Sequence, residues 1–218
     1  MRKPTLRAAV IAVLAMSALA RAQGAPKSDP AQSHTMALPA PGEASKALAR
    51  FFGGSLNWTG TLEPGAMGPA SKPAVTRGRA NCRALYGGLW FACDVEEAMG
   101  TGKEARTWKG HLLVGYDLGT RGYRAMVIDN TGTMTTYNGT LNGDIFTLET
   151  PEDGMIMGQR MKDRLTWDVS NGKTMKFTDE HQTEGGDWKL AESAEIKRPN
   201  VVGSTSRLEG MGLSNTRK

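Results

Sequence analysis

Three acidic residues and one histidine near the end of the chain are the side chains best placed to do chemistry. Asp163, Asp179 and Glu192 lie on three successive predicted strands, and His181 follows two residues after Asp179. Carboxylates that face one another in a partly dry site raise one another's pKa, so they can act as acid–base groups or bind a cation or an amine. The same pattern also fits solvated residues at the rim of a sheet, and both interpretations stay open here.

The sequence contains no recognisable motif for a nucleophile, a phosphate loop or a metal site. It has neither G-x-S-x-G nor G-x-x-x-x-G-K-S/T, and its three histidines, His34, His111 and His181, lack metal-ligand spacing. A single histidine such as His181 is weak evidence for a haem ligand. We therefore assign no catalytic residue, no metal ligand and no cofactor from the sequence.

The acidic residues must be positioned by β-strands. Short segments in which apolar and polar residues alternate, separated by Gly, Asn and Asp, fill most of the chain. One helix is predicted over 44–52, with its apolar residues on one side and Gly53-Gly54 after it. Candidate strands follow at 55–62, 74–85, 89–97, 107–117, 123–128, 134–141, 144–150, 160–169, 173–183 and 187–197. This spacing predicts an all-β fold, namely an antiparallel barrel of about 8–10 strands with one short N-terminal helix; a β-sandwich is the alternative.

Two turns set the predicted register of the acidic residues. A three-residue turn at 170–172 pairs Trp167 with Met175 and places Asp163 opposite Asp179. The next turn, centred on Gly185-Gly186, places Asp179 opposite Glu192. Both registers place the apolar side chains of these strands on the same face of the sheet. The row formed by Asp163, Asp179 and Glu192, called the acidic row, lies on that face too. We therefore predict a ligand-binding site lined by Asp163, Asp179, His181, Glu192, Trp167 and Phe177.

Two earlier hairpins give further predictions. An Asn-Gly turn at 142–143 pairs Leu148 with Tyr137. A Gly-Gly turn after Tyr86 sets Cys82 opposite Cys93, and directly opposed Cα atoms, about 5.5 Å apart or less, lie within disulfide reach. In an exported protein with two cysteines, this arrangement predicts a Cys82–Cys93 disulfide.

The first 22 residues have the features of a cleavable secretory signal. Three basic residues within the first seven precede an uncharged run over 8–20 and an A-x-A pattern at 20–22. The 13-residue run is shorter than the roughly 20 residues that a membrane span needs. We expect cleavage between Ala22 and Gln23, and a mature chain in the periplasm or the medium.

The composition of the chain predicts one folded domain between two loose ends. We expect disorder over 23–43 and 199–218, and a β-barrel domain over 44–198. The formal net charge is +5, but residues 44–196 hold 17 Lys and Arg against 19 Asp and Glu. The excess positive charge thus belongs to the ends, and we predict no nucleic-acid partner and no membrane span in the mature chain. The oligomeric state stays open.

Several segments resemble one bacterial family. They are Trp58-Thr59-Gly60, Leu85–Trp90, Asp94–Glu97, Leu113–Asp117 and Glu192–Arg198. Over roughly 44–198 the chain resembles the family called domain of unknown function fifteen seventy-nine, which is thought to adopt a lipocalin-like (calycin) β-barrel. The resemblance implies that fold and assigns no catalytic residues.

Together these features predict an exported barrel that binds a small, partly apolar ligand at its mouth or has an accessory role in the envelope. One alternative is an enzyme that uses Asp163, Asp179 and His181 as acid–base groups. Another is a structural envelope protein whose barrel is filled by its own side chains. A pocket that contains the acidic row would favour a binding protein or an enzyme over a structural role.

Overall fold

Alternating apolar and polar residues form eleven antiparallel strands in the computed structural model, which describes residues 39–152, 154–156 and 159–199. The first six strands are β1 (Gly54–Leu62), β2 (Ala74–Leu85), β3 (Trp90–Met99), β4 (Arg106–Asp117), β5 (Gly122–Asp129) and β6 (Met134–Asn142). The others are β7 (Ile145–Glu149), β8 (Gly154–Ile156), β9 (Gln159–Asp168), β10 (Met175–Thr183) and β11 (Lys189–Lys197). Single 3-10 turns lie at Tyr86–Gly88 and Gly102–Glu104.

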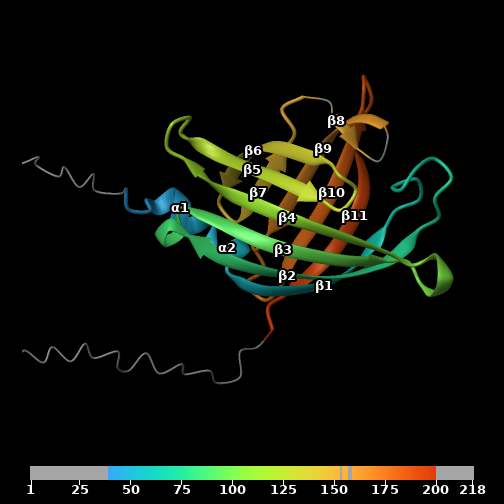
Figure 1. The fold of residues 1–218 in the computed structure, drawn as a ribbon, viewed down its shortest axis with the longest axis horizontal. Helices are drawn as coiled ribbons and strands as arrows, with labels where there is room; N and C mark the ends of the chain where they lie inside the picture. The colour runs from blue at the N-terminus through green and yellow to red at the C-terminus, as the bar shows by residue number, and fades with distance from the viewer. Residues whose placement is uncertain (1–38, 153, 157–158, 200–218) are drawn as a thin grey trace, which may run out of the picture. The chain divides into compact units, whose positions relative to one another are not determined.

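These strands close into a barrel (Figure 1). The strand order is β10-β11-β1-β2-β3-β4-β5-β6-β7-β9-β8, and the pairing of β9 with β10 joins the two sides. Ten strands therefore form the closed wall, and the three-residue β8 pairs with β9 beyond the end of β7. The predicted all-β antiparallel barrel is confirmed, and the sandwich alternative is wrong.

Two short helical segments fill one end of the barrel. They are α1 (Glu43–Ala47) and α2 (Ala49–Phe52), on either side of Leu48. Leu48, Phe51 and Phe52 are almost fully buried, so the apolar side predicted for this helix faces the barrel interior. We call this the helix end, and we call the opposite end, with the connections at 63–73, 100–105, 130–133 and 184–188, the loop end. Within the described residues, neither helix is long and apolar enough to cross a membrane.

The register of two hairpins agrees with the sequence prediction. Cys82 is paired with Cys93 across β2 and β3, with Cα atoms 4.0 Å apart and the two sulfur atoms at bonding distance, 2.02 Å. On β10 and β11, Asp179 is paired with Glu192 and Phe177 with Ala194, but a bulge after Asp179 shifts the pairing nearer the turn by one residue, so that Glu180 lies opposite Leu190. Both pairings follow turns rich in glycine.

The predicted pairing of Leu148 with Tyr137 is wrong by two residues. Leu148 lies opposite Gly139, because Asn142 stays in the strand and pairs with Ile145. The turn therefore consists of Gly143 and Asp144, with Gly143 in the left-handed region at φ 59°. An ion pair between Arg50 and Asp144 joins this turn to α2.

The predicted pairing of Trp167 with Met175 is also wrong by two residues. Trp167 lies opposite Phe177, and Asp163 lies opposite His181 instead of Asp179. The turn is longer than predicted because the Asn171 side chain accepts hydrogen bonds from the backbone N–H groups of residues 173 and 174, at 3.0 and 2.9 Å. A shift of two residues keeps every side chain on the same face of its strand.

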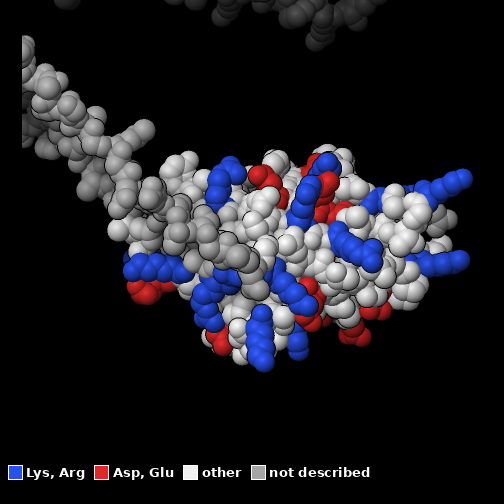
Figure 2. Space-filling view, turned by 90° about the horizontal axis from the view of Figure 1, so that it is seen from below, with Lys and Arg blue, Asp and Glu red and all other residues white. Residues whose placement is uncertain are grey.

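Charged side chains cover the outside of the barrel. Figure 2 shows Lys and Arg side chains interspersed with Asp and Glu side chains on one face. Several of these charges are paired across strands, as in Arg79 with Glu96 at 2.5 Å and Lys109 with Glu96 at 3.4 Å. Exposed pairs of this kind contribute little to stability.

Candidate functional site

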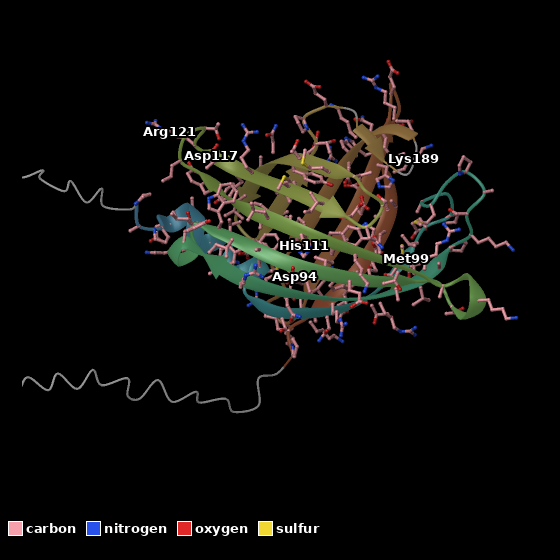
Figure 3. All side chains as sticks on the ribbon, viewed as in Figure 1. Asp94, Met99, His111, Asp117, Arg121 and Lys189 are labelled. Atoms are coloured by element: carbon pink, nitrogen blue, oxygen red, sulfur yellow. A yellow bond between two sulfur atoms is a disulfide. The ribbon has the colours of Figure 1, made fainter. Side chains whose placement is uncertain are left out.

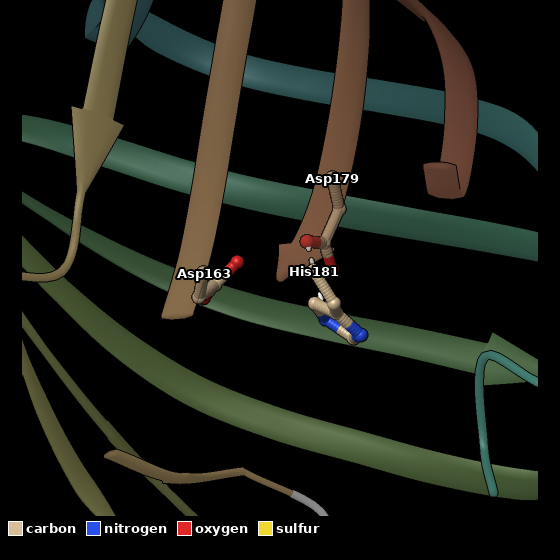
Figure 4. Close-up of side chains that lie close together, drawn as sticks. All are labelled: Asp163, Asp179 and His181. Atoms are coloured by element: carbon tan, nitrogen blue, oxygen red, sulfur yellow. Dashed lines mark ion pairs between the residues drawn. The ribbon is translucent and has the colours of Figure 1, made fainter. Parts of the chain in front are cut away.

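Four of the predicted site residues meet on the inner wall of the barrel. Asp163 lies on β9, Asp179 and His181 on β10, and Glu192 on β11. Asp163 is 6% exposed and Glu192 5% exposed, whereas Asp179 and His181 are half-buried. The side chains of Asp163, Asp179 and His181 lie side by side on the paired strands β9 and β10 (Figure 4). The acidic row is thus an interior feature.

Asp163 is held from two sides. The Tyr137 hydroxyl donates a hydrogen bond of 2.6 Å to Asp163 Oδ2, and the Thr150 hydroxyl accepts one of 3.0 Å from the Asp163 backbone N–H. Asp163 Oδ1 is buried without a hydrogen-bond partner. Burial raises the pKa of the Asp163 carboxyl well above its usual range, and the adjacent Asp179 raises it further.

Asp179 and His181 form an ion pair on the same strand. His181 Nε2 lies 3.3 Å from Asp179 Oδ1, but it does not have the geometry of a hydrogen bond, so this carboxylate oxygen is also buried without a hydrogen-bond partner. Burial lowers the pKa of His181, and the Asp179 carboxylate raises it by more, so the net shift is upward. The pair therefore favours a protonated imidazole.

Glu192 reaches across a neighbouring strand. The Thr76 hydroxyl, on β2, donates a 2.6 Å hydrogen bond to Glu192 Oε1, on β11, and β1 runs between the two. Gly60 of β1 makes this possible, because a Cβ there would lie 2.7 Å from Thr76 Oγ1. Burial and the nearby Glu97 carboxyl raise the pKa of Glu192 to about 9.

Glu97 is a member of the site that the sequence analysis missed. It is 9% exposed on the inner face of β3, and it accepts a 2.6 Å hydrogen bond from the Trp58 indole N–H. The indole lies over Gly78, where a Cβ would come within 2.0 Å of the ring. The four carboxyl groups of Asp163, Asp179, Glu192 and Glu97, together with His181, are called the acidic cluster below.

A signal for Glu97 was present in the sequence. Glu97 lies four residues after Cys93 in a predicted strand, so the period of two places it on the same inward face. Tyr137 could be placed inward by the same alternation. The two bridges over Gly60 and Gly78 could not be predicted, because strand alternation does not show that a side chain will cross a neighbouring strand.

Two other predicted site residues belong to the packed core. Trp167 contacts Phe52 and Phe177, with ring centroids 5.2 and 5.3 Å apart. Phe146 joins the same group, at 5.6 Å from Phe52 and 6.0 Å from Trp167. These rings fill the helix end of the interior, whereas the acidic cluster lies further toward the loop end.

The outer surface carries a hollow of about 640 Å³ over β2 to β5. Its lining includes a histidine–carboxylate pair, His111 with Asp94, whose Nδ1 and Oδ1 atoms lie 2.5 Å apart. Both side chains are more than half exposed and lie on adjacent strands (Figure 3). This solvated pair contrasts with the half-buried pair of His181 and Asp179.

The acidic cluster offers donors for a positively charged group. One donor atom each from Asp163, Asp179 and His181 lies within 4.8 Å of the others. Ionised carboxylates buried this close repel one another, so they must take up protons or a cation. The arrangement can therefore hold a cation, or exchange protons with a bound molecule.

Comparison with known proteins identifies a family. No curated protein matches the chain in sequence. The solved structure titled "Crystal Structure of Rv2717c from M. tuberculosis" is similar at 12% identity and a TM-score of 0.47, covering 72% of this chain and 98% of that chain. The family described as "Protein of unknown function (DUF1579)" matches residues 40–198. The chain therefore belongs to the DUF1579 family, as its segments in β1, β3, β4 and β11 suggested.

Proposed function

We propose that this protein is a non-enzymatic binding protein, and that the acidic cluster holds the positively charged group of a small ligand. The observation that carries the proposal is a pair of buried carboxylate oxygens, Asp163 Oδ1 and Asp179 Oδ1, without hydrogen-bond partners. Leaving such acceptors unsatisfied costs about 1–3 kcal/mol each or more. A cation between them would satisfy both oxygens at once.

The packing of the interior supports binding through the positive group of the ligand and not through an apolar part of it. Phe51, Phe52, Phe146 and Trp167 pack against one another at the helix end, with ring centroids about 5–6 Å apart. A ligand is therefore expected to enter from the loop end and to meet the acidic cluster first. The sequence predicted a partly apolar ligand. The structure supports a positive charge on the ligand better than it supports an apolar part.

The compartment is proposed to be outside the cytoplasm. The support comes from the basic, apolar and small-residue segments at the N-terminus and from the paired Cys82 and Cys93. Disulfides persist in oxidising compartments such as the periplasm. Exported protein would therefore be the form that meets the ligand.

A thermal-unfolding screen tests the binding proposal. The melting temperature is measured at constant ionic strength with NaCl alone, methylammonium, putrescine, Mg²⁺ or Zn²⁺. At least one of these cations is expected to raise the melting temperature above the value in NaCl, because ligands that bind only the folded state stabilise it. Asp179→Asn should abolish that rise, since it removes one charge of the cluster and keeps its size.

The control for this screen is Asp94→Asn, which removes an exposed carboxylate on the outer face. That variant should respond to each cation as the wild-type chain does. If no cation raises the melting temperature, or if the rise survives in Asp179→Asn, the proposal is wrong. A barrel filled by its own side chains would then be the better description.

A further inference from the structure

We propose that Asp163, Asp179 and His181 form a site for one divalent transition-metal cation of the Zn²⁺ or Mn²⁺ class. The inference rests on the proposed binding function and names the ligand of the same site. It is carried by the convergence of three donor atoms and by the unpartnered oxygen of a buried aspartate.

The spacing of the donors suits a single ion. Since the three atoms lie within 4.8 Å of one another, some point lies no more than about 2.8 Å from all three. Zinc–oxygen and zinc–nitrogen distances are about 2.0–2.2 Å. Each donor would have to move by less than about 1 Å to reach those distances, which side-chain rotation within the cluster can supply.

Asp163 has the features of an oriented metal ligand. Its Oδ2 is fixed by the Tyr137 hydroxyl at 2.6 Å, while Oδ1 has no partner and the side chain is almost fully buried. Metal-binding carboxylates are commonly held in this way, by a hydrogen bond to the oxygen that does not bind the ion. Thr150 adds a second restraint through the Asp163 backbone.

The donor types select the class of cation. Two carboxylate oxygens and one imidazole nitrogen suit Zn²⁺, Mn²⁺ and Fe²⁺, whereas Mg²⁺ and Ca²⁺ favour ligand sets made of oxygen alone. His181 would bind the ion in its neutral form, so the ion would displace the proton that the Asp179 carboxylate otherwise favours. His181 is therefore the residue that separates a transition-metal site from a general cation site. It is also the residue that separates a metal from a proton shared by Asp163 and Asp179, since a shared proton does not need the imidazole.

The test uses the full chain without a polyhistidine tag, stripped with a chelator and then dialysed. Isothermal titration with ZnCl₂ should give one bound equivalent per chain, with MnCl₂ binding at the same site and MgCl₂ much more weakly. His181→Gln should weaken Zn²⁺ binding at least about 10-fold, which is the low end for losing even a supporting residue of a metal site. Asp179→Asn should have a comparable effect, and it serves as a second variant if His181→Gln unfolds.

The matched control is His111→Gln, which removes the imidazole of the solvated pair with Asp94. Its Zn²⁺ affinity should equal that of the wild-type chain. Equal Zn²⁺ binding by His181→Gln and the wild-type chain, or no binding by either, would overturn the metal site. If methylammonium or putrescine still binds in a manner that needs Asp179 but not His181, the proposed function stands and only the metal assignment fails.

Discussion

At the scale of single residues, the surroundings of Glu192 raise its pKa, and this shift makes the stability of the chain depend on pH. Burial and the neighbouring Glu97 raise its pKa from 4.5 to about 9, so it is protonated in the folded chain at neutral pH. In the unfolded chain it is ionised above its ordinary pKa. The folded chain therefore holds more protons between about pH 4.5 and 9, and its free energy of unfolding falls as the pH rises through this window, by about 1.4 kcal/mol per pH unit for one such group.

Glu192→Gln should remove that dependence. The glutamine keeps an oxygen to accept the Thr76 hydrogen bond, but it does not titrate. The variant should show a flatter profile of unfolding free energy between pH 5 and 9, and at pH 8 it should be more stable than the wild-type chain by about 1 kcal/mol or more. Urea unfolding with a chelator present measures both quantities. The exposed Glu195→Gln is the control, and parallel profiles for Glu192→Gln and the wild-type chain would show that Glu192 is ionised in the folded state.

At the scale of strands and turns, glycine turns were predicted more reliably than turns that contain asparagine. The register of Cys82 with Cys93 is correct, because it follows a turn built on adjacent glycines. The pairing of Asp179 with Glu192 is correct only because a bulge after Asp179 offsets a shift of one residue next to the Gly185-Gly186 turn. Asn142 remained in its strand, and Asn171 lengthened its turn by binding two backbone N–H groups. Both errors are shifts of two residues, which is why the acidic residues were still placed on the inward face.

The crossing of Thr76 over Gly60 gives a prediction at this scale. A Cβ at Gly60 would lie 2.6 Å from the Ser193 carbonyl oxygen and 2.8 Å from Ala194 Cβ. Gly60→Ala should therefore lower the free energy of unfolding by about 1–3 kcal/mol through overpacking, and more if the Thr76 bond to Glu192 is lost. Gly122→Ala, whose Cβ would meet only the Thr120 carbonyl oxygen at 4.0 Å, is the control. Equal stability of the two variants in urea would contradict the close approach at Gly60.

The hairpin of β2 and β3 supports a prediction about the cysteines. Their register and the 11-residue separation predict that the disulfide adds about 2–3 kcal/mol by restricting the unfolded chain. Peptide mapping without reductant should recover Cys82 linked to Cys93, and the Cys82→Ala, Cys93→Ala double variant should lose about that much stability. Two thiols that react freely with an alkylating reagent in the native, unreduced protein would end this prediction.

At the scale of the whole molecule, the barrel separates a filled apolar end from a polar interior. The predicted signal falls outside the described residues, so its processing stays a prediction. N-terminal sequencing of the protein released by its own cells should begin at Gln23. A chain that starts at Met1, or one retained in the membrane, would refute the cleavage.

Native mass spectrometry of the protein purified from its own cells, without chelator, tests the binding claim most directly. The account predicts that the wild-type chain carries an added mass, that of a metal ion or a small cationic molecule, and that acid denaturation releases it. Asp179→Asn prepared in the same way should lack this mass, whereas Asp94→Asn, altered on the outer face, should retain it. A wild-type spectrum with only the bare chain, or an added mass that persists in Asp179→Asn, would contradict binding at the acidic cluster.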